Sequence, residues 1–296
     1  MAAARTDALP ASPLADSHVW VRVGFLALPL AIMYYETLGK LFGDWWNDPN
    51  NSHGLLIPPM ALYIAWRKRS RLTAAAVEPQ VVLGILGLLS SLVVYFVGRL
   101  GAEFFLTRVS LIGLLGSLIL FFLGREHFRL LLFPLTLLAL AIPIPVLVIN
   151  TISLPLQSLA SQWGAGFLSF CGVPVLREGN VIHLATTALG VAEACSGLRS
   201  LVSLFTLAVI LAYLRWQGLG QRTLLVLLAV PVALLLNIMR IAITGLIADY
   251  WDVKYALGFF HEFSGWLVFL LAFAILFGIS AVIQKLWPSP PPEELA

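Results

Sequence analysis

The string LLVLLAVPVALLLNIMRIAITGLIA occupies residues 224–248 and is long enough for one helix to cross the hydrocarbon core of a bilayer. Its only charged residue is Arg240. An arginine inside a span costs roughly 3 kcal/mol on insertion scales, so it normally faces a polar cavity and has a function. Asn237, Arg240 and Thr244 are spaced i, i+3 and i+7 and therefore share one helix face. The string predicts a transmembrane helix with a polar stripe; the alternative is an arginine that snorkels into the outer interface.

The composition of the whole chain agrees with a membrane protein. Of its 296 residues, 60% are hydrophobic and 11% are charged, whereas ordinary soluble domains carry about 25% charged residues. The formal charge is +3, but the basic residues form small clusters between apolar runs instead of following one polar face. The clusters are therefore topology signals, and the partner they indicate is the lipid bilayer and not a nucleic acid.

We predict an all-α polytopic membrane protein with eight spans. The predicted spans are residues 21–42, 55–66, 81–97, 105–123, 130–149, 198–214, 224–248 and 265–283. Around them, residues 1–19 are expected to form a cytoplasmic segment, 20–286 the membrane domain, and the proline-rich end, 287–296, a disordered cytoplasmic tail.

Basic clusters give the orientation of these spans. The residues that follow even-numbered spans are Arg67, Lys68, Arg69, Arg71, Arg125, Arg129, Arg215, Arg222 and Lys285. The positive-inside rule places that side, and with it both termini, in the cytoplasm. Arg99 and Arg108 run against this count and are a minority.

The longest extracytoplasmic stretch is residues 150–196, directly before the sixth predicted span. Its first part, 152–170, has loose helical periodicity and predicts a small helix in the plane of the membrane interface. Short apolar runs and turn residues from 173 to 192 then predict a β-meander. Two further outer loops, 43–54 and 249–264, are rich in polar and aromatic residues.

Three polar residues lie towards the outer ends of the last three predicted spans. Cys195 precedes the sixth span, where a helix N-terminus would favour its thiolate; the alternative is a small buried apolar residue. Arg240 lies in the seventh span and His261 opens the eighth. Together such groups can transfer an acyl group: a thiolate attacks a carbonyl, an imidazole transfers the proton and a guanidinium stabilises the oxyanion. We expect the three to converge in one pocket, with Asn237 close by.

The chain has two cysteines, Cys171 and Cys195. They are too few for a disulfide framework and lack metal-ligand spacing, so neither a metal nor another cofactor is expected. A disulfide between them is conceivable outside the cytoplasm. It would block the nucleophile, so we expect free thiols.

Several motifs resemble those of the exosortase and archaeosortase family. The strings ACSGLR at 194–199 and NIMRI at 237–241, with His261 before the final span, look like the family's three motif blocks. An upstream string, WNDPNNSHG at 46–54, followed by Pro58 and by WRKR at 66–69, is similar to its N-terminal signature. The resemblance extends over about residues 45–265.

The resemblance implies an enzyme of the bacterial inner membrane with an extracytoplasmic active site. Cys195 would be the nucleophile, Arg240 the transition-state stabiliser and His261 the general acid or base. The remaining candidates, which would support these groups or contact substrate, are Asn237, Ser196, Arg199 and His53. The implied substrates are membrane-anchored exported proteins whose C-terminal sorting tail joins a Pro-Glu-Pro-like motif, a transmembrane helix and a basic cluster. The acyl acceptor, an amine or water, stays open.

Three other classes of protein are compatible with parts of the pattern. A transporter would use Arg240 to bind an anionic substrate, but such proteins usually show related halves. A lipid-linked glycan transferase or acyltransferase would use polar outer residues, of which Asp48 and His53 are the nearest pair. A rhomboid-like protease would use Ser196, although no Gly-x-Ser-x-Gly string surrounds it.

Overall fold

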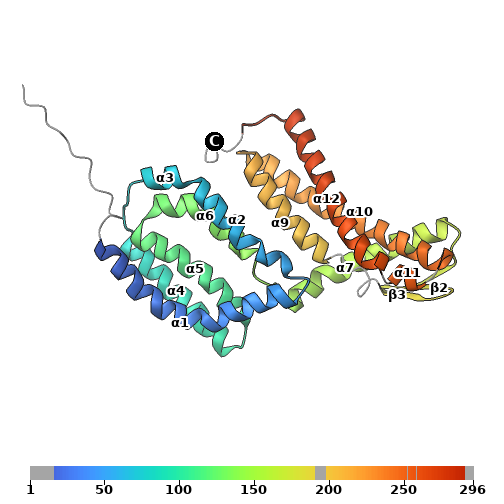
Figure 1. The fold of residues 1–296 in the computed structure, drawn as a ribbon, viewed down its shortest axis with the longest axis horizontal. Coiled ribbons are helices and arrows are strands. Elements are labelled where there is room, and N and C mark those ends of the chain that lie inside the picture. Colours follow the sequence, from blue (N-terminus) through green and yellow to red (C-terminus); the bar gives the residue numbers. More distant parts are fainter. Residues whose placement is uncertain (1–16, 191–197, 252, 258, 291–296) are drawn as a thin grey trace, which may run out of the picture. The chain divides into compact units, whose positions relative to one another are not determined.

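The computed structural model describes residues 17–190, 198–251, 253–257 and 259–290. Its helices and strands belong to two compact units (Figure 1). We call the chain up to Asp48 together with Gly54–Pro143 the N-terminal unit, and Pro49–His53 with the chain from Ile144 onward the C-terminal unit. Along the chain, the 3-10 turn η2 (Ser52–Leu55) lies where one unit gives way to the other.

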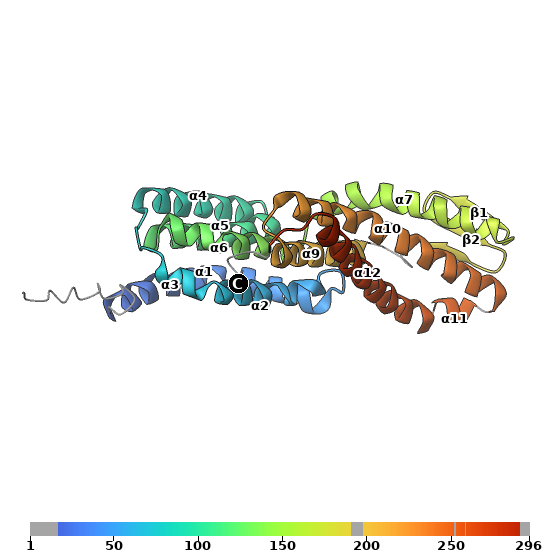
Figure 2. The same ribbon diagram turned by 90° about the horizontal axis from the view of Figure 1, so that it is seen from above.

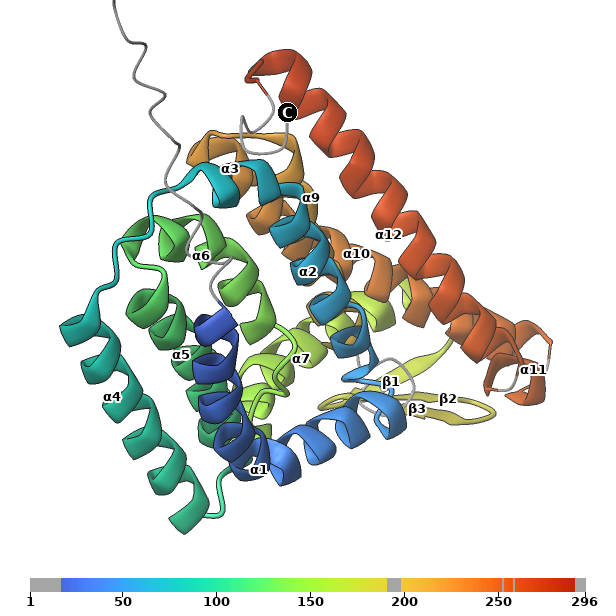
Figure 3. The same cartoon turned by 60° about the vertical axis from the view of Figure 1, so that its left-hand side comes forward.

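The described part of the N-terminal unit consists of helices and their connections, with one isolated β-bridge between Glu78 and Gly124. Its helices are α1 (Ser17–Asn47), α2 (Ile57–Arg67), α3 (Arg69–Ala74), α4 (Val81–Leu100), α5 (Phe104–Phe122) and α6 (Arg125–Ala139). α4 and α5 form a hairpin whose helices lie side by side (Figure 3). A Cβ at Gly84 would lie only 2.7 Å from the Cα of Phe121, so glycine is what lets the two backbones approach.

Two boundaries in this unit differ from the prediction. α1 continues to Asn47, so the first five residues of the predicted loop 43–54 are helical; the first proline of that loop is Pro49, just beyond the end of the helix. The predicted fifth span, 130–149, is split: α6 ends at Ala139 and the next helix begins at Val146. Pro143 and Pro145 favour this break, because a proline disfavours the helical conformation at the residue before it and here two prolines lie within three residues.

A tryptophan side chain donates a hydrogen bond to a backbone carbonyl group in the break between α6 and the next helix. Trp45 Nε1 donates to the carbonyl oxygen of Ala141 at 2.7 Å. Trp45 therefore has a structural role within the N-terminal unit, whereas its neighbour Trp46 is exposed. The short helix α2, 11 residues long, agrees with the short second span of the prediction.

The arginines that ran against the positive-inside count are both paired with carboxylates of α1. Arg99 Nη1 lies 2.7 Å from Glu36 Oε2, and Arg108 Nη2 lies 2.5 Å from Asp44 Oδ2. The Arg108 side chain is 6% exposed, so this charge depends on its partner.

We expect Asp44→Asn to lower the free energy of unfolding by about 2 kcal/mol, because it leaves Arg108 as a buried charge without its counter-ion. The loss stays below the roughly 3–5 kcal/mol of a fully buried pair, since Asp44 is partly exposed. Glu126→Gln, which removes the exposed pair with Arg129, should cost under about 1 kcal/mol. Denaturant unfolding in detergent micelles measures both; equal, small losses would contradict a structural role for the Arg108 pair.

The C-terminal unit combines helices with the predicted β-meander. Its elements are α7 (Val146–Phe170), β1 (Val175–Glu178), β2 (Val181–Leu184), β3 (Ala188–Gly190), α9 (Leu198–Arg215), α10 (Leu219–Tyr250), α11 (Val253–Leu257) and α12 (Phe259–Leu286). The strands form an antiparallel sheet in the order β1-β2-β3, as predicted. The helix predicted at 152–170 begins six residues earlier, directly after Pro145, and is therefore longer than the small helix we expected.

α10 packs against two different sets of elements along its length. Its first part, up to Leu236, forms a buried apolar core with α9 and α12. Its last part, from Ile241 to Ala248, forms a second core with α7, the strands and α11. Figure 2 shows α7 and the strands along the end of α10 that leads to α11. The helix thus connects a helical bundle to a mixed α/β cap.

Length and composition make four of the described helices able to cross a membrane. They are α4, α5, α10 and the segment Phe263–Leu286 of α12. Leu201–Arg215 in α9 is apolar but shorter. The chain is thus a mostly helical membrane protein with a small sheet, and the count of eight spans stays a prediction.

Candidate functional site

The polar stripe of α10 lies where the two cores of the C-terminal unit meet. Asn237 and Arg240 fall between Leu236, the last fully buried α10 residue of the bundle core, and Ile241, the first fully buried α10 residue of the cap core. Asn237 and Thr244 are buried at 8% and 5% exposure, and Arg240 is half-buried. The predicted face therefore turns into the protein, as expected for a polar group that a span must keep away from lipid.

Arg240 reaches from α10 to the beginning of α12. Its Nε donates to Ser264 Oγ at 3.2 Å. A Cβ at Gly265 would lie 3.5 Å from Nη2, 3.7 Å from Cζ and 3.9 Å from Nη1. These similar distances mean that the flat guanidinium lies over the backbone of Gly265. The side chain is thus held against a neighbouring helix, which differs from the snorkelling alternative.

The hydrogen bond at Nε determines how the guanidinium is oriented. Nε and the two Nη atoms lie in one plane, so a partner at Nε and a surface at Gly265 together set the direction of the terminal Nη edge. A planar fork held in this way is suited to two parallel hydrogen bonds with an oxyanion or carboxylate. Sequence reasoning identified Arg240 but not Ser264 or Gly265 as its support; their position one turn after His261 was the available signal.

The other catalytic candidates fall wholly or partly outside the described residues. Cys195 and Ser196 lie in the segment 191–197, for which no structure is described. Arg199 belongs to the first turn of α9, and His261 to the first turn of α12, but their side chains are not among those described. The predicted convergence of Cys195, Arg240 and His261 therefore stays a prediction.

His53 and Cys171, the last two predicted residues, lie at ends of local structure. His53 belongs to η2, next to a turn in which Ser52 Oγ donates to the Pro49 carbonyl at 3.0 Å. Cys171 is a half-buried free cysteine directly after α7, and its backbone N–H donates to the Phe167 carbonyl.

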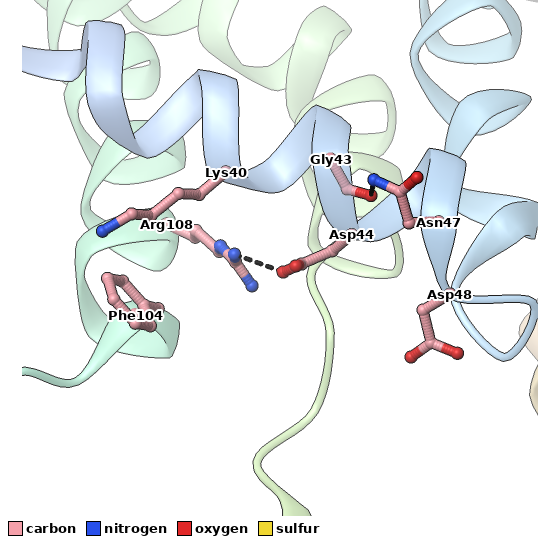
Figure 4. A pocket seen from close by; sticks show the side chains of 7 residues that line it. All are labelled: Lys40, Gly43, Asp44, Asn47, Asp48, Phe104 and Arg108. Atoms are coloured by element: carbon pink, nitrogen blue, oxygen red, sulfur yellow. Dashed lines mark hydrogen bonds and ion pairs between the residues drawn. The ribbon is translucent and has the colours of Figure 1, made fainter.

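A second polar group, which the sequence did not reveal, lines a pocket of about 460 Å³ in the N-terminal unit (Figure 4). Its lining residues are Lys40, Gly43, Asp44, Asn47, Asp48, Phe104 and Arg108. The i, i+4 and i+8 spacing of Lys40, Asp44 and Asp48 is the signal that could have found it; the first two lie on α1 and Asp48 follows directly after it. Arg108 bonds to Asp44, and Lys40 bonds to Glu36 at 2.7 Å and lies over the Phe104 ring. The basic groups are therefore balanced by carboxylates.

No arrangement typical of a metal site occurs within residues 17–190, 198–251, 253–257 and 259–290: no three His, Cys, Asp or Glu side chains are grouped to hold an ion.

Comparison with known proteins gives one match. A family model described as transmembrane exosortase matches residues 45–278, which include Arg240, Ser264 and the cap. No curated protein matches the chain significantly, and no solved structure does.

Proposed function

Because the chain belongs to the transmembrane exosortase family, and is thus a membrane-embedded enzyme that processes sorting signals, we propose that it is a cysteine endopeptidase or transpeptidase. It cleaves the C-terminal sorting tails of exported proteins through a thioester on Cys195. The carrying observation is Arg240, an arginine of a membrane span that is held by Ser264 at the start of the helix containing His261. A charge fixed in this way is suited to stabilise a developing oxyanion.

The proposed reaction has two steps with balanced protons. The Cys195 thiolate attacks the scissile carbonyl carbon, and the oxygen becomes an oxyanion that Arg240 stabilises. The C–N bond then breaks, and protonated His261 donates its proton to the leaving amine. In the second step an amine or water attacks the thioester, His261 accepts its proton, and Cys195 leaves as the thiolate.

The substrate class is consistent with the place of Arg240 on its helix. The residue lies in the last third of α10, where the bundle core gives way to the cap. A tailed substrate stays anchored by its own transmembrane helix, so a site at this level would act beside the end of that helix. We propose that the level corresponds to the extracytoplasmic side of the bacterial inner membrane, with both termini in the cytoplasm, and that the site opens sideways to lipid.

The decisive experiment uses the full chain and a tailed substrate. The enzyme is co-expressed with an exported protein carrying a Pro-Glu-Pro-like motif, a transmembrane helix and a basic cluster, and mass spectrometry reads the new C-terminus. We expect a single cut near the motif that depends on Cys195. An intact tail, or cleavage that continues in Cys195→Ser and Cys195→Ala, would contradict the proposal.

Ser264 supplies a second test. We expect Ser264→Ala to lower kcat about tenfold with KM unchanged, because a hydrogen bond to a charged group that orients Arg240 is lost. Ser264→Thr keeps the hydroxyl and should restore most of the rate. Ser280→Ala is the matched control, because Ser280 is a buried serine of the same helix whose hydroxyl donates to Phe277 within that helix. Equal rates for the alanine and threonine variants would contradict an orienting role.

A further inference from the structure

The β-meander has two edges, of which the β3 edge turns main-chain groups outward. The Leu184 N–H donates to the Thr187 carbonyl at 2.7 Å, so these two residues form a hydrogen-bonded pair. Hydrogen-bonded and non-hydrogen-bonded pairs alternate in antiparallel strands. From the register, Leu189 exchanges bonds with Ile182, whereas the N–H and C=O groups of Ala188 point away from β2.

Gly190 follows the same alternation as Ala188, because it lies two residues later and faces Val181 in a non-hydrogen-bonded pair. β3 therefore presents two sets of outward N–H and C=O groups. Within the described residues, neither Ala188 nor Gly190 has a further backbone hydrogen bond. Such a row of groups is complementary to an extended polypeptide.

The two edges of the sheet differ in how they are protected. The β1 edge carries charged Arg177 and Glu178, and Arg177 Nη1 donates to the Ser158 carbonyl and to Ser161 Oγ of α7 at 3.1 and 3.2 Å. β3 reads Ala-Leu-Gly and has neither a charge nor a proline. Natural sheets usually block an edge by such means. An edge left open beside a blocked one indicates a use for it.

β3 is also held firmly near the candidate site. Leu189 is 3% exposed and belongs to the cap core, and Thr186 Oγ1 donates to the Ala248 carbonyl of α10 at 3.4 Å. Ala248 follows Arg240 by eight residues, or about 12 Å along the helix axis. Along the chain, Gly190 precedes Cys195 by five residues. A fully extended chain of five residues spans at most about 18 Å.

We infer that the open edge of β3 binds the substrate's polypeptide as an added strand, through the main-chain groups of Ala188 and Gly190. The inference rests on the proposed function, since the occupant is the peptide whose carbonyl Cys195 attacks. Strand addition holds a peptide extended by its main chain, and side-chain pockets are not required for that part of the binding. It would hold the residues beside the scissile bond on a rigid strand whose last residue, Gly190, precedes Cys195 by five positions in the sequence.

Backbone methylation of the substrate tests the inference on the unmodified enzyme. The probe is a synthetic peptide with the sorting motif, an apolar span and a basic end, in which single non-proline amides beside the cut are N-methylated. In an added strand only every second amide faces β3. We expect KM to rise about fivefold or more at alternate positions and to stay unchanged between them. A uniform response or none would overturn the inference.

A proline variant tests the same edge from the enzyme's side. Ala188→Pro removes the outward N–H without removing a bond to β2, and proline is tolerated on edge strands. We expect KM to rise about fivefold with kcat unchanged. Val175→Pro is the matched control, because the register turns the Val175 N–H outward on β1; it should leave KM as in the wild type. Equal KM values for all three proteins would contradict binding at β3.

The two proposals fail in different ways. If Cys195→Ala still cleaves the peptide, the proposed function is wrong. If cleavage requires Cys195 but KM does not alternate along the series of methylated peptides, the proposed function holds and only the β3 site is wrong. If the Ala188→Pro variant does not fold, the methylated peptides still test the β3 site, because they are assayed with the unmodified enzyme.

Discussion

Replacing Cys195 by alanine is expected to abolish processing of a tailed substrate, with a loss of about a thousandfold or more, because no thioester can form without the thiol. Cys171→Ala, in contrast, is expected to process substrate nearly normally. Cys171 is a half-buried free cysteine at the end of α7. The measurement is the rate at which the tail is removed from co-expressed substrate, read by mass spectrometry.

The cysteine pair provides its own control for folding. Both variants should reach the membrane at wild-type levels, and a thiol-reactive probe should label Cys195 more readily in the Cys171→Ala enzyme than Cys171 in the Cys195→Ala enzyme, since a low-pKa thiolate reacts faster. Lost processing in Cys171→Ala together with retained processing in Cys195→Ala would reverse the assignment. Normal processing in both variants would exclude a cysteine nucleophile.

Arg240→Lys is expected to lose about a hundredfold in kcat while the protein stays folded. Lysine keeps the positive charge, but its single ammonium group cannot donate to Ser264 Oγ and at the same time offer two parallel hydrogen bonds in one plane. In the structure, the Nε–H bonds to Ser264 and the guanidinium plane lies over Gly265, so both features of the fork are used. Single-turnover kinetics on the tailed peptide would place the loss in the first chemical step.

Gly265 offers a control for the geometry of Arg240. Gly265→Ala adds a Cβ at ordinary van der Waals distance, 3.5 Å from Nη2, and should be nearly neutral, whereas Gly265→Leu should displace the guanidinium and resemble Arg240→Lys. Near-normal turnover in Arg240→Lys would show that a point charge is sufficient. The role of Arg240 would then be generic electrostatics, and the orienting contacts from α12 would be unrelated to catalysis.

Most helices of the chain were accessible from hydropathy, because helix formation inside a bilayer is a local requirement. Each span must satisfy its backbone groups internally, so its sequence reports its own structure. Hence α4, α5 and α9 begin and end within three residues of the predicted boundaries, whereas α10 and α12 begin five and six residues before theirs. The break at Pro143 and Pro145 is the largest difference, since an apolar count over 130–149 overlooks what two prolines do to the residues before them.

The candidate site was accessible only in part. The spacing of Asn237, Arg240 and Thr244 predicted a polar face on α10, and the burial of Asn237 and Thr244 confirms that this face turns inward. What that face contacts depends on how α10 packs against α12. The two residues that show this contact, Arg240 and Ser264, are 24 positions apart in the sequence. No local pattern encodes such a contact, because packing between helices is decided by the shapes of both.

The sequence by itself determined that this chain is a membrane protein, that it contains a β-meander before α9, and which family it belongs to. It could do so because hydropathy, strand alternation and motif strings are all patterns within short segments of the sequence. Only the tertiary structure decided that Arg240 is oriented by Ser264, that Trp45 satisfies the carbonyl of Ala141, and that β3, among the described residues, pairs with a strand on one side only. These are contacts between distant segments, or the lack of a neighbour at an edge, and each depends on where the rest of the chain has folded.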